Sequence, residues 1–417
     1  MTESYDVVVV GSGPAGSTVA ALLGRAGLHV ALLEAHGDRD AYKRLCTHFI
    51  QSSALPTLQR IGADKAIEAA GGLRNRGSVW TRYGLVREPE NPRGRPTHGY
   101  NIRRTLLDPI LRSIAADTPG VDLVLGAKVR DLTRTGGDRV DGVTATVDGA
   151  ERRIAARLVV GADGRHSRVA EAAGLPAREI PNERFGYFAA YRNVGFTHDT
   201  PGQMWLLDPD AVYAFRNEDG ITILATMPAK ARLSEFTDDR EAALLSSYVD
   251  LPGGPDVSGV ERVSDVIGTK DYPSVVRKRV TAAGVALIGD AALVGDPLWG
   301  VGCGWAVQSA GWLADAVSGP LAGTDPSALD AALRRYGRVH RRRLMPHQKL
   351  ALDFSSGRTF SRLERLLFAG AVHDPWVADR FYAYGTRNVS PAALLSPRLL
   401  LRAARARRRA VQPVSSG

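Results

Sequence analysis

Three short apolar runs are the clearest pattern in the chain, and a glycine-rich turn follows each of them. The runs are YDVVVV at residues 5–10, RLVVG at 157–161 and VALIG at 285–289. Consecutive apolar positions rich in β-branched residues are typical of strands that are buried on both faces of a parallel sheet. The stretch STVAALLGRAG after the first turn is helical in character. These segments predict an α/β domain.

The middle of the chain has a different pattern, in which apolar and polar positions alternate. Between residues 177 and 277 the alternating runs are RFGYFAAYRNV, GQMWLLD, AVYAFRN and GITILATM. A period of two residues predicts antiparallel strands with one face on a core. From residue 349 onward the pattern is helical.

The first turn has the spacing G-x-G-x-x-G, made by Gly11, Gly13 and Gly16 with Pro14 and Ala15 between them. In this context the first glycine permits a tight turn, and the second lets the backbone approach a pyrophosphate. The third allows the helix to pack closely on the strand. Phosphates would then face free N–H groups at the positive end of the helix dipole. We expect all five residues to contact the cofactor.

A second strand, HVALLEA, ends at Glu34. An acid at this distance past the glycines accepts hydrogen bonds from the hydroxyls of an adenosine ribose, and it repels the 2′-phosphate of NADP. Strand, glycine turn, helix, strand and acid in this order predict dinucleotide binding.

Two distant motifs favour FAD over NAD. The second apolar run leads into Asp163-Gly164, and the third ends in Gly289-Asp290. An aspartate at the carboxyl end of a parallel strand is placed to accept hydrogen bonds from the ribityl hydroxyls of a flavin. The later segment Pro297-x-x-Gly300-x-Gly302 opens a further helix. Its N–H groups would face the N1/O2 edge of the flavin and stabilise the anionic reduced form.

These motifs together resemble the para-hydroxybenzoate-hydroxylase-type flavoprotein superfamily. That superfamily includes aromatic monooxygenases, flavin-dependent halogenases and geranylgeranyl reductases. A fourth element, Arg104-x-x-Leu107-Asp108, resembles the R-x-x-L-D segment of the family. The resemblance implies that Arg104 lies near the flavin and the pyrophosphate.

The expected fold class is α/β, with a Rossmann-type FAD-binding domain, an inserted antiparallel sheet and a C-terminal helical segment. We assign residues 1–75, 100–176 and 278–348 to the FAD-binding domain. Residues 76–99 and 177–277 would form the substrate domain and roof the flavin. Residues 349–417 would form the helical region with its basic tail.

The expected reaction is monooxygenation of a small hydrophobic or aromatic metabolite, such as those of secondary metabolism, in a dry pocket. NAD(P)H would reduce the flavin and bind transiently, because no second G-x-G-x-x-G is present. The stretch from Arg165 to Arg168 would help to hold its phosphates. Leu293 stands where aromatic hydroxylases of the family commonly carry histidine, and the W-x-W-x-I-P segment of halogenases is absent.

The alternative is a reductase or dehydrogenase that moves hydride to or from a substrate carbon, and a flavin-dependent halogenase is a further option. Arg44-x-Cys46 resembles the basic-x-Cys element of the reductase branch, whereas Asp296-Pro297-Leu298-Trp299 resembles a halogenase stretch. We expect Cys46, Arg44 and Trp299 to be catalytic, with Arg44 also near the cofactor. Cys303 is expected to serve packing. In a non-enzymatic role the flavin would be purely structural and the basic tail would bind a partner or nucleic acid. The P-x-x-G-x-G segment at the reactive edge of the flavin disfavours this role.

Aromatic residues are the main candidates for the substrate pocket. Tyr213 and Phe215 alternate onto one face of a strand, and Trp299 lies in a cofactor motif. Trp205 is expected to line the pocket as well, and Trp80 and Tyr83 are further candidates. The nine histidines show no ligand spacing, so no metal site is expected.

Charge and cysteine content add little that changes this picture. The net charge is +10, and from Arg334 onward there are 18 Lys+Arg against 4 Asp+Glu. We interpret the tail as a solvated basic helix end with at most peripheral contacts, and expect a small-molecule substrate and no nucleic acid. Two cysteines, no leader peptide and no apolar run of about 20 residues predict a cytoplasmic protein without a membrane span. The oligomeric state is left open.

Overall fold

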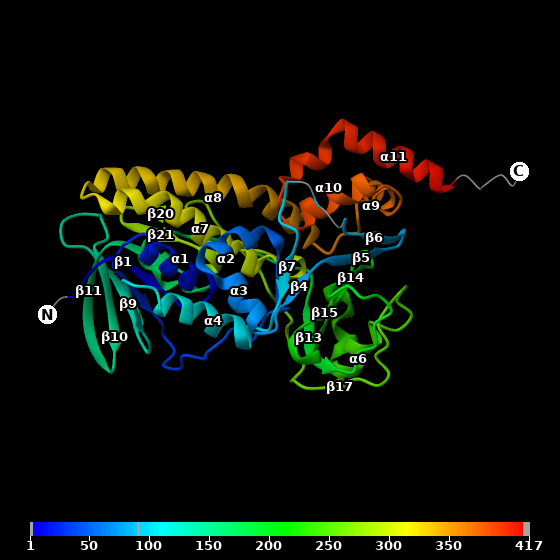
Figure 1. Ribbon diagram of the computed structural model, residues 1–417, viewed down its shortest axis with the longest axis horizontal. Coiled ribbons are helices and arrows are strands. Elements are labelled where there is room, and N and C mark those ends of the chain that lie inside the picture. Colours follow the sequence, from blue (N-terminus) through cyan, green and yellow to red (C-terminus); the bar gives the residue numbers. More distant parts are fainter. Residues whose placement is uncertain (1–2, 90–91, 93, 412–417) are drawn as a thin grey trace, which may run out of the picture.

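The computed structural model describes residues 3–89, 92 and 94–411, and it has the expected mixed α/β architecture (Figure 1). An eight-stranded sheet forms the core of the N-terminal part, with the order β20-β21-β11-β1-β2-β8. Strands β21, β11, β1, β2 and β8 pair in parallel, and β20, β10 and β9 are added by antiparallel pairing. The strand bounds are β1 Glu3–Val10, β2 Val30–Leu33, β8 Val121–Val124, β9 Lys128–Thr133, β10 Gly142–Val147, β11 Ala150–Gly161, β20 Thr281–Ala282 and β21 Val285–Leu287.

Helices cover this sheet because its strands are apolar at successive positions. Val7, Val8 and Val9 of β1 are fully buried, as the apolar run predicted. Helix α1 packs on α4 and α7, and α7 packs on α8. The helices of this part are α1 Pro14–Arg25, α2 Leu55–Ile61, α3 Ala63–Ala69, α4 Arg104–Ala116, α5 Arg168–Ala172, α7 Gly302–Ala322 and α8 Pro326–Phe354.

A second eight-stranded sheet has the order β17-β13-β16-β15-β14-β5-β6, with β18 also paired to β13. It is antiparallel except for the parallel pair β14 and β5. The four alternating runs of the sequence form β13 to β16, so the inserted antiparallel sheet is confirmed. The bounds are β5 Gly77–Thr81, β6 Gly84–Arg87, β13 Gly186–Arg192, β14 Gly202–Leu206, β15 Ala211–Arg216, β16 Thr222–Met227, β17 Glu261–Arg262 and β18 Ile267–Thr269, with α6 Arg240–Ser246 packed against the sheet.

Two small sheets complete the strand set. One has the order β3-β7-β4, and the other has the order β12-β19-β22. Their bounds are β3 Phe49–Ile50, β4 Leu73–Asn75, β7 Gly99–Asn101, β12 Ala177–Ile180, β19 Ser274–Arg277 and β22 Leu293–Val294.

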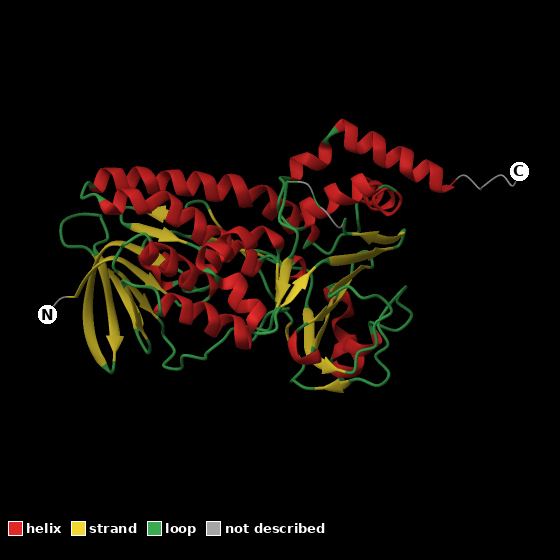
Figure 2. Ribbon diagram, in the orientation of Figure 1, coloured by secondary structure: helices red, strands yellow, loops and turns green. Residues whose placement is uncertain are grey.

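The C-terminal part is helical, as expected, and lies beside the second sheet (Figure 2). It contains α9 Arg362–His373, α10 Pro375–Gly385 and α11 Pro397–Val411. Helix α9 packs on both α10 and α11 and on β6 of the second sheet. The crossing of α9 and α11 is close, since a Cβ on Gly370 would lie 2.6 Å from the Cβ of Ala403. None of the described helices combines the length and the apolarity that crossing a bilayer requires.

Candidate active site

A cavity of about 850 Å³, which we call the cofactor cavity, lies where β1, β2 and β11 end and where α1 and α7 begin. Every cofactor motif found in the sequence contributes to its wall. The predicted residues that line it are Gly11, Gly13, Pro14, Ala15, Glu34, Cys46, Arg104, Asp163, Gly164, Asp290, Pro297, Gly300 and Gly302.

The three glycines of the first turn have different structural roles. Gly11 has φ +97°, and a Cβ there would lie 2.6 Å from the carbonyl oxygen of Ala162. A Cβ on Gly16 would lie 1.8 Å from the oxygen of Gly11, so Gly16 lets α1 meet the turn. Gly13 has open space at its Cβ position and faces the cavity. Gly13 caps α1 without a side chain, and the first N–H groups of the helix therefore stay free for an anion.

Glu34 lies at the end of β2, where a ribose would be held. Its Oε2 accepts hydrogen bonds from the backbone N–H of Ser12 (2.9 Å) and from the Ser12 hydroxyl (2.7 Å). Its Oε1 accepts from the N–H of His36 at 2.9 Å. Burial raises the pKa of Glu34, but the hydrogen bonds from His36 and Ser12 outweigh it, and the pKa lies below its ordinary value. Glu34 is thus a fixed anion at the cavity wall.

The two aspartates that were expected near the ribityl chain differ in their availability. Asp163 accepts hydrogen bonds from the Ser167 hydroxyl at 2.5 Å and from the N–H of Val169 at 3.1 Å, so it organises the start of α5. Asp290 faces the cavity, and its Oδ2 lies 2.8 Å from the Nζ of Lys43. This ion pair lies at the cavity wall. Within the described residues the other oxygen of Asp290 accepts no hydrogen bond, whereas both oxygens of Asp163 accept hydrogen bonds.

The expectation for Arg44 is not met by the structure. Its side chain is largely exposed and pairs with Asp265 at 3.3 Å, and it does not line the cofactor cavity. The neighbouring Lys43 lines the cavity instead. The loop between β2 and β3 turns Lys43 and Cys46 inward and Arg44 outward. An irregular loop has no period from which this orientation could be predicted.

The third motif packs onto the first. A Cβ on Gly289 (φ +56°) would lie 2.9 Å from the Cβ of Ala15, so Gly289 permits the contact between the two cofactor turns. Helix α7 begins at Gly302 with no side-chain cap, and Gly302 has open space toward the cavity. Its first N–H groups can therefore stabilise negative charge on a ligand.

Two thiols and a buried arginine lie at this end of the cofactor cavity. Arg104 donates from Nε and Nη2 to both oxygens of Asp108 at 2.6 and 2.7 Å, and its Nη1 lies 3.7 Å from the Sγ of Cys303. The backbone N–H of His48 donates to the Sγ of Cys46 at 3.3 Å. Both cysteines line the cavity, although only packing was expected of Cys303.

The pKa values of the two thiols are shifted in opposite directions. A hydrogen bond from Cys303, with the positive charge of Arg104, holds the pKa of Cys46 well below its usual range. The hydrogen bond to Cys46 and burial hold the pKa of Cys303 well above its usual range. Of the two thiols, Cys46 therefore loses its proton more readily and Cys303 keeps its proton more firmly.

A second cavity of about 650 Å³, which we call the apolar cavity, adjoins the first. Thr47, Phe49 and Gly300 line both cavities. The ring of Phe49 stacks on Phe215 with centroids 5.3 Å apart, and a Cβ on Gly300 would lie 2.9 Å from that ring. Phe49 therefore stands at the junction of the two cavities.

The structure places three of the four predicted pocket aromatics in the apolar cavity. Tyr213, Phe215 and Trp299 line it, and the Tyr213 hydroxyl donates to the carbonyl oxygen of Leu298. Trp205 does not line either cavity. Because side chains alternate along β14, Met204 and Leu206 face the cavity, whereas Trp205 packs on the opposite face and donates to the oxygen of Pro252 at 3.0 Å.

Of the two further candidates, Trp80 contributes to the same far-side core as Trp205, and Tyr83 lies outside both cavity walls.

The far wall of the apolar cavity comes from the C-terminal helices, which sequence reasoning did not assign to the pocket. Their apolar lining residues are Leu363, Leu367, Phe368, Val377, Phe381, Tyr382 and Leu399. The aromatic content of residues 354–384 was the available signal, but nothing in it indicated which cavity these residues would face.

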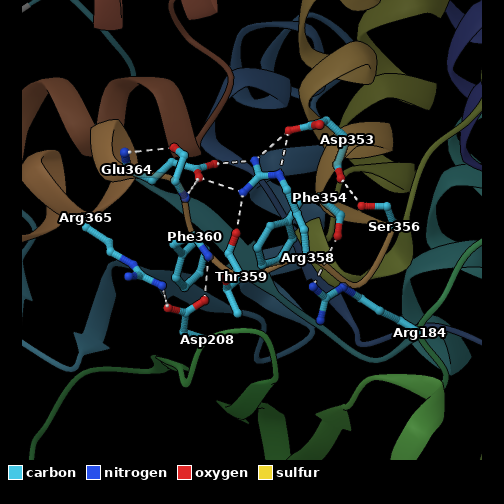
Figure 3. Close-up of polar contacts among 11 residues, drawn as sticks. Arg184, Asp208, Asp353, Phe354, Ser356, Arg358, Thr359, Phe360, Glu364 and Arg365 are labelled. Atoms are coloured by element: carbon cyan, nitrogen blue, oxygen red, sulfur yellow. Dashed lines mark hydrogen bonds and ion pairs between the residues drawn. The ribbon is translucent and has the colours of Figure 1, made fainter.

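Ion pairs hold this wall in place (Figure 3). Arg358 donates to Asp353 at 2.7 Å and to both oxygens of Glu364 at 2.8 and 2.9 Å, which joins the end of α8 to the start of α9. Asp208 of the second sheet's β14–β15 turn accepts from the N–H of Phe360 at 2.5 Å and from Arg365 at 3.0 Å. The helices are thereby fixed over the sheet.

The donor set of the cofactor cavity fits FAD. Two uncapped helix N-termini, the open Gly13 and Gly302 positions, the Glu34 anion and Asp290 match the pyrophosphate, the adenosine ribose and the flavin half of FAD. Residues 4–348 match the model of a protein family described as an FAD binding domain. The chain belongs to this FAD-binding family. It is therefore an FAD-dependent oxidoreductase.

Two of the relatives with curated descriptions are reductases. The chain is 30% identical over 303 residues to digeranylgeranylglycerophospholipid reductase 1 of Methanopyrus kandleri. The aligned region covers 72% of this chain and 76% of the relative. It is 35% identical over 176 residues to the menaquinone reductase of Mycolicibacterium smegmatis, over 42% of this chain and 41% of the relative. The chain thus matches less than half the length of that menaquinone reductase.

The fold is also similar to that of a solved flavin-dependent brominase. The TM-score is 0.78 at 18% identity, and the match covers 98% of this chain and 100% of the brominase chain. At this identity the likeness concerns the fold alone.

Proposed function

We propose that the protein is an FAD-dependent reductase that saturates a carbon–carbon double bond in a long apolar chain, such as a prenyl group. The observation that carries this proposal is the apolar cavity, which meets the cofactor cavity at Phe49. A substrate in the apolar cavity would reach the flavin end of the cofactor cavity, where the two thiols lie.

The size and the lining of the apolar cavity favour a long chain. A single aromatic ring would leave much of about 650 Å³ unfilled. Among the charged residues on its wall, Glu88 pairs with Arg95 at 3.0 Å, Arg358 binds Asp353 and Glu364, and Lys349 is exposed. Within the described part of the chain, three polar side-chain atoms of the lining are buried without a hydrogen-bond partner, namely Gln51 Oε1, Asn75 Oδ1 and Trp299 Nε1. The rest of the lining is mainly apolar, so burial of an alkyl chain is favourable along most of the wall.

The residues that would hold FAD are those of the four motifs. Gly11 to Gly16 and Glu34 would bind the adenosine diphosphate half, Asp290 the ribityl chain, and the start of α7 the flavin ring. Bound FAD, once reduced by NAD(P)H, supplies a hydride to one carbon of the double bond. The cavity lining around Arg165 and Arg168 offers positive charge for the nicotinamide cofactor's phosphates.

Completing the reduction requires a proton at the second carbon. Cys303 would carry this proton as a thiol, and its Sγ lies 3.7 Å from the Nη1 of Arg104. Breaking the S–H bond of Cys303 as the new C–H bond forms would leave a Cys303 thiolate beside the positive charge of Arg104, and a proton from solvent would restore the thiol. Phe49 and Trp299 would exclude water from this junction.

The proposal is tested by product mass. The flavin-loaded protein is incubated with NADH or NADPH and with a geranylgeranylated glycerophospholipid or a menaquinone. Reduction adds two hydrogens per double bond, and in deuterated water at least one of them is deuterium. Cys303→Ser is expected to keep its flavin and lose most of this activity. A product that gains one oxygen atom instead contradicts the proposal.

Oxygenation, the reaction expected from the sequence, stays a prediction that the same assay tests. Under labelled dioxygen it would place the label in the product.

A further inference from the structure

Helix α11 presents a strongly basic outer surface. Its apolar side chains Leu399, Ala403 and Ala406 are buried toward the neighbouring helices. Within the described part of the chain, its four last arginines are exposed and form no ion pair, and α11 has no acidic residue. These arginines are Arg405, Arg407, Arg408 and Arg409.

Exposed leucines lie next to this charge. Leu395 and Leu401 have 61% and 59% of their surface exposed, and Leu350 on α8 has 37%. Leu350 and Leu395 also line the apolar cavity, so they mark the mouth through which it opens to the outside. Leu401 is an exposed residue of α11. Large exposed aliphatic side chains at the rim of an apolar cavity indicate contact with another apolar phase.

The other side of the mouth is basic as well. Lys349 is exposed, lines the cavity and precedes Leu350 on α8. Arg342 and Arg343 are exposed about two turns earlier on the same helix. Helices α8 and α11 lie along one side of the molecule, the upper side in Figure 1. We call this set the basic rim: Arg342, Arg343, Lys349, Leu350, Leu395, Leu401, Arg405, Arg407, Arg408 and Arg409.

We propose that the basic rim binds the surface of an anionic lipid bilayer, with the mouth of the apolar cavity facing the lipid. Arginines pair with anionic headgroups while the leucines enter the boundary of the acyl chains, as in helices that lie in a membrane interface. The identity of the lipid that enters the apolar cavity rests on the proposed function, whereas binding of the basic rim to the bilayer surface does not. A nucleic acid would use the arginines and leave the leucines at the cavity mouth in water.

The test is sedimentation of the full flavin-loaded chain with vesicles. Phosphatidylcholine vesicles with and without phosphatidylglycerol are compared at low and high salt. Each arginine near an anionic surface is worth roughly a fivefold change in partitioning. The variant with Arg405, Arg407, Arg408 and Arg409 all changed to Gln is therefore expected to lose at least about a hundredfold in affinity for anionic vesicles. Raised salt weakens wild-type binding for the same reason.

A matched control removes four positive charges elsewhere on the surface. It changes four exposed residues outside both helices to Gln, namely Arg178, Lys270, Lys278 and Arg279. The control should bind as the wild type does. The α11 variant should keep its flavin and its turnover of a detergent-dispersed substrate but lose turnover of substrate held in anionic vesicles.

Several results would overturn docking: equal binding to vesicles without phosphatidylglycerol, equal losses in both variants, or tighter binding to duplex DNA than to vesicles. A protein that binds vesicles but reduces no prenyl substrate would refute the proposed function alone.

Discussion

Filling the apolar cavity from Gly385 should change which chain lengths the enzyme accepts. Gly385 ends α10 and lines the cavity, and its Cβ position has no atom within 4 Å. Gly385→Leu therefore adds a side chain at the wall of the apolar cavity, and its Cβ has room there. Gly385 is not among the glycines with positive φ, so the substitution adds no backbone strain of that kind.

The magnitude follows from the buried surface. Each buried methylene is worth about 0.8 kcal/mol, so the four carbons of the leucine side chain displace up to about 3 kcal/mol of substrate binding. That corresponds to roughly a 200-fold fall in kcat/KM for a substrate that fills the cavity. A truncated substrate with the same reactive group should lose little. The flavin content should not change, because Gly385 does not line the cofactor cavity.

The assay compares kcat/KM for the long and the truncated substrate in wild type and variant. Gly319→Leu is the control, since Gly319 is an exposed helical glycine with equally open space and lies outside both cavities. Equal losses for the two substrates, or no loss for either, would refute the assignment of the apolar cavity to the substrate tail.

Three further predictions concern the cofactor cavity. Gly13→Ala should weaken FAD binding by about tenfold or more while the stability of the apoprotein stays unchanged. Gly11→Ala should lower the stability of the apoprotein by at least about 1–2 kcal/mol, because Gly11 has a φ of +97°. Calorimetry measures the stability and flavin titration the affinity, and identical effects of the two substitutions would count against distinct roles for the two glycines. Glu34 has a depressed pKa, so its ionised form stabilises the fold above the ordinary carboxyl pKa of about 4.3, and this stabilisation is lost as the pH falls. Glu34→Gln should therefore unfold at lower denaturant concentration than the wild type near neutral pH. The difference between the two should disappear in acid, as denaturant titrations at several pH values would show. Cys46 has a lowered pKa, so it should be alkylated below the ordinary thiol pKa of about 8.5 while Cys303 is spared. Peptide mass mapping that finds both modified only at alkaline pH would contradict the opposite shifts of the two thiols.

Local signals explain why much of the cofactor cavity was predictable. The run of valines in β1 and the spacing of Gly11, Gly13 and Gly16 reflect burial and backbone approach within a few residues. The alternating runs likewise predicted strands β13 to β16 correctly. These features depend on chain positions close to one another.

Other features depend on long-range packing and have no local signal. Arg44 and Lys43 are neighbours of similar chemistry, and only the path of the loop decides that Lys43 faces Asp290. Trp205 shares β14 with three residues that line the apolar cavity, but side chains alternate along the strand and Trp205 faces the other way. The C-terminal wall was missed because its position over the second sheet is set by ion pairs such as that of Asp208 with Arg365, 157 residues apart.

The most direct test of double-bond reduction by this protein is a single turnover without dioxygen. The flavin of the loaded protein is reduced chemically under anaerobic conditions and then mixed with a prenyl-chain substrate, and the visible absorbance of oxidised flavin is followed. We predict that the absorbance returns in step with saturation of one double bond. Absorbance that returns only when dioxygen is admitted, with oxygen found in the product, would contradict a reductase.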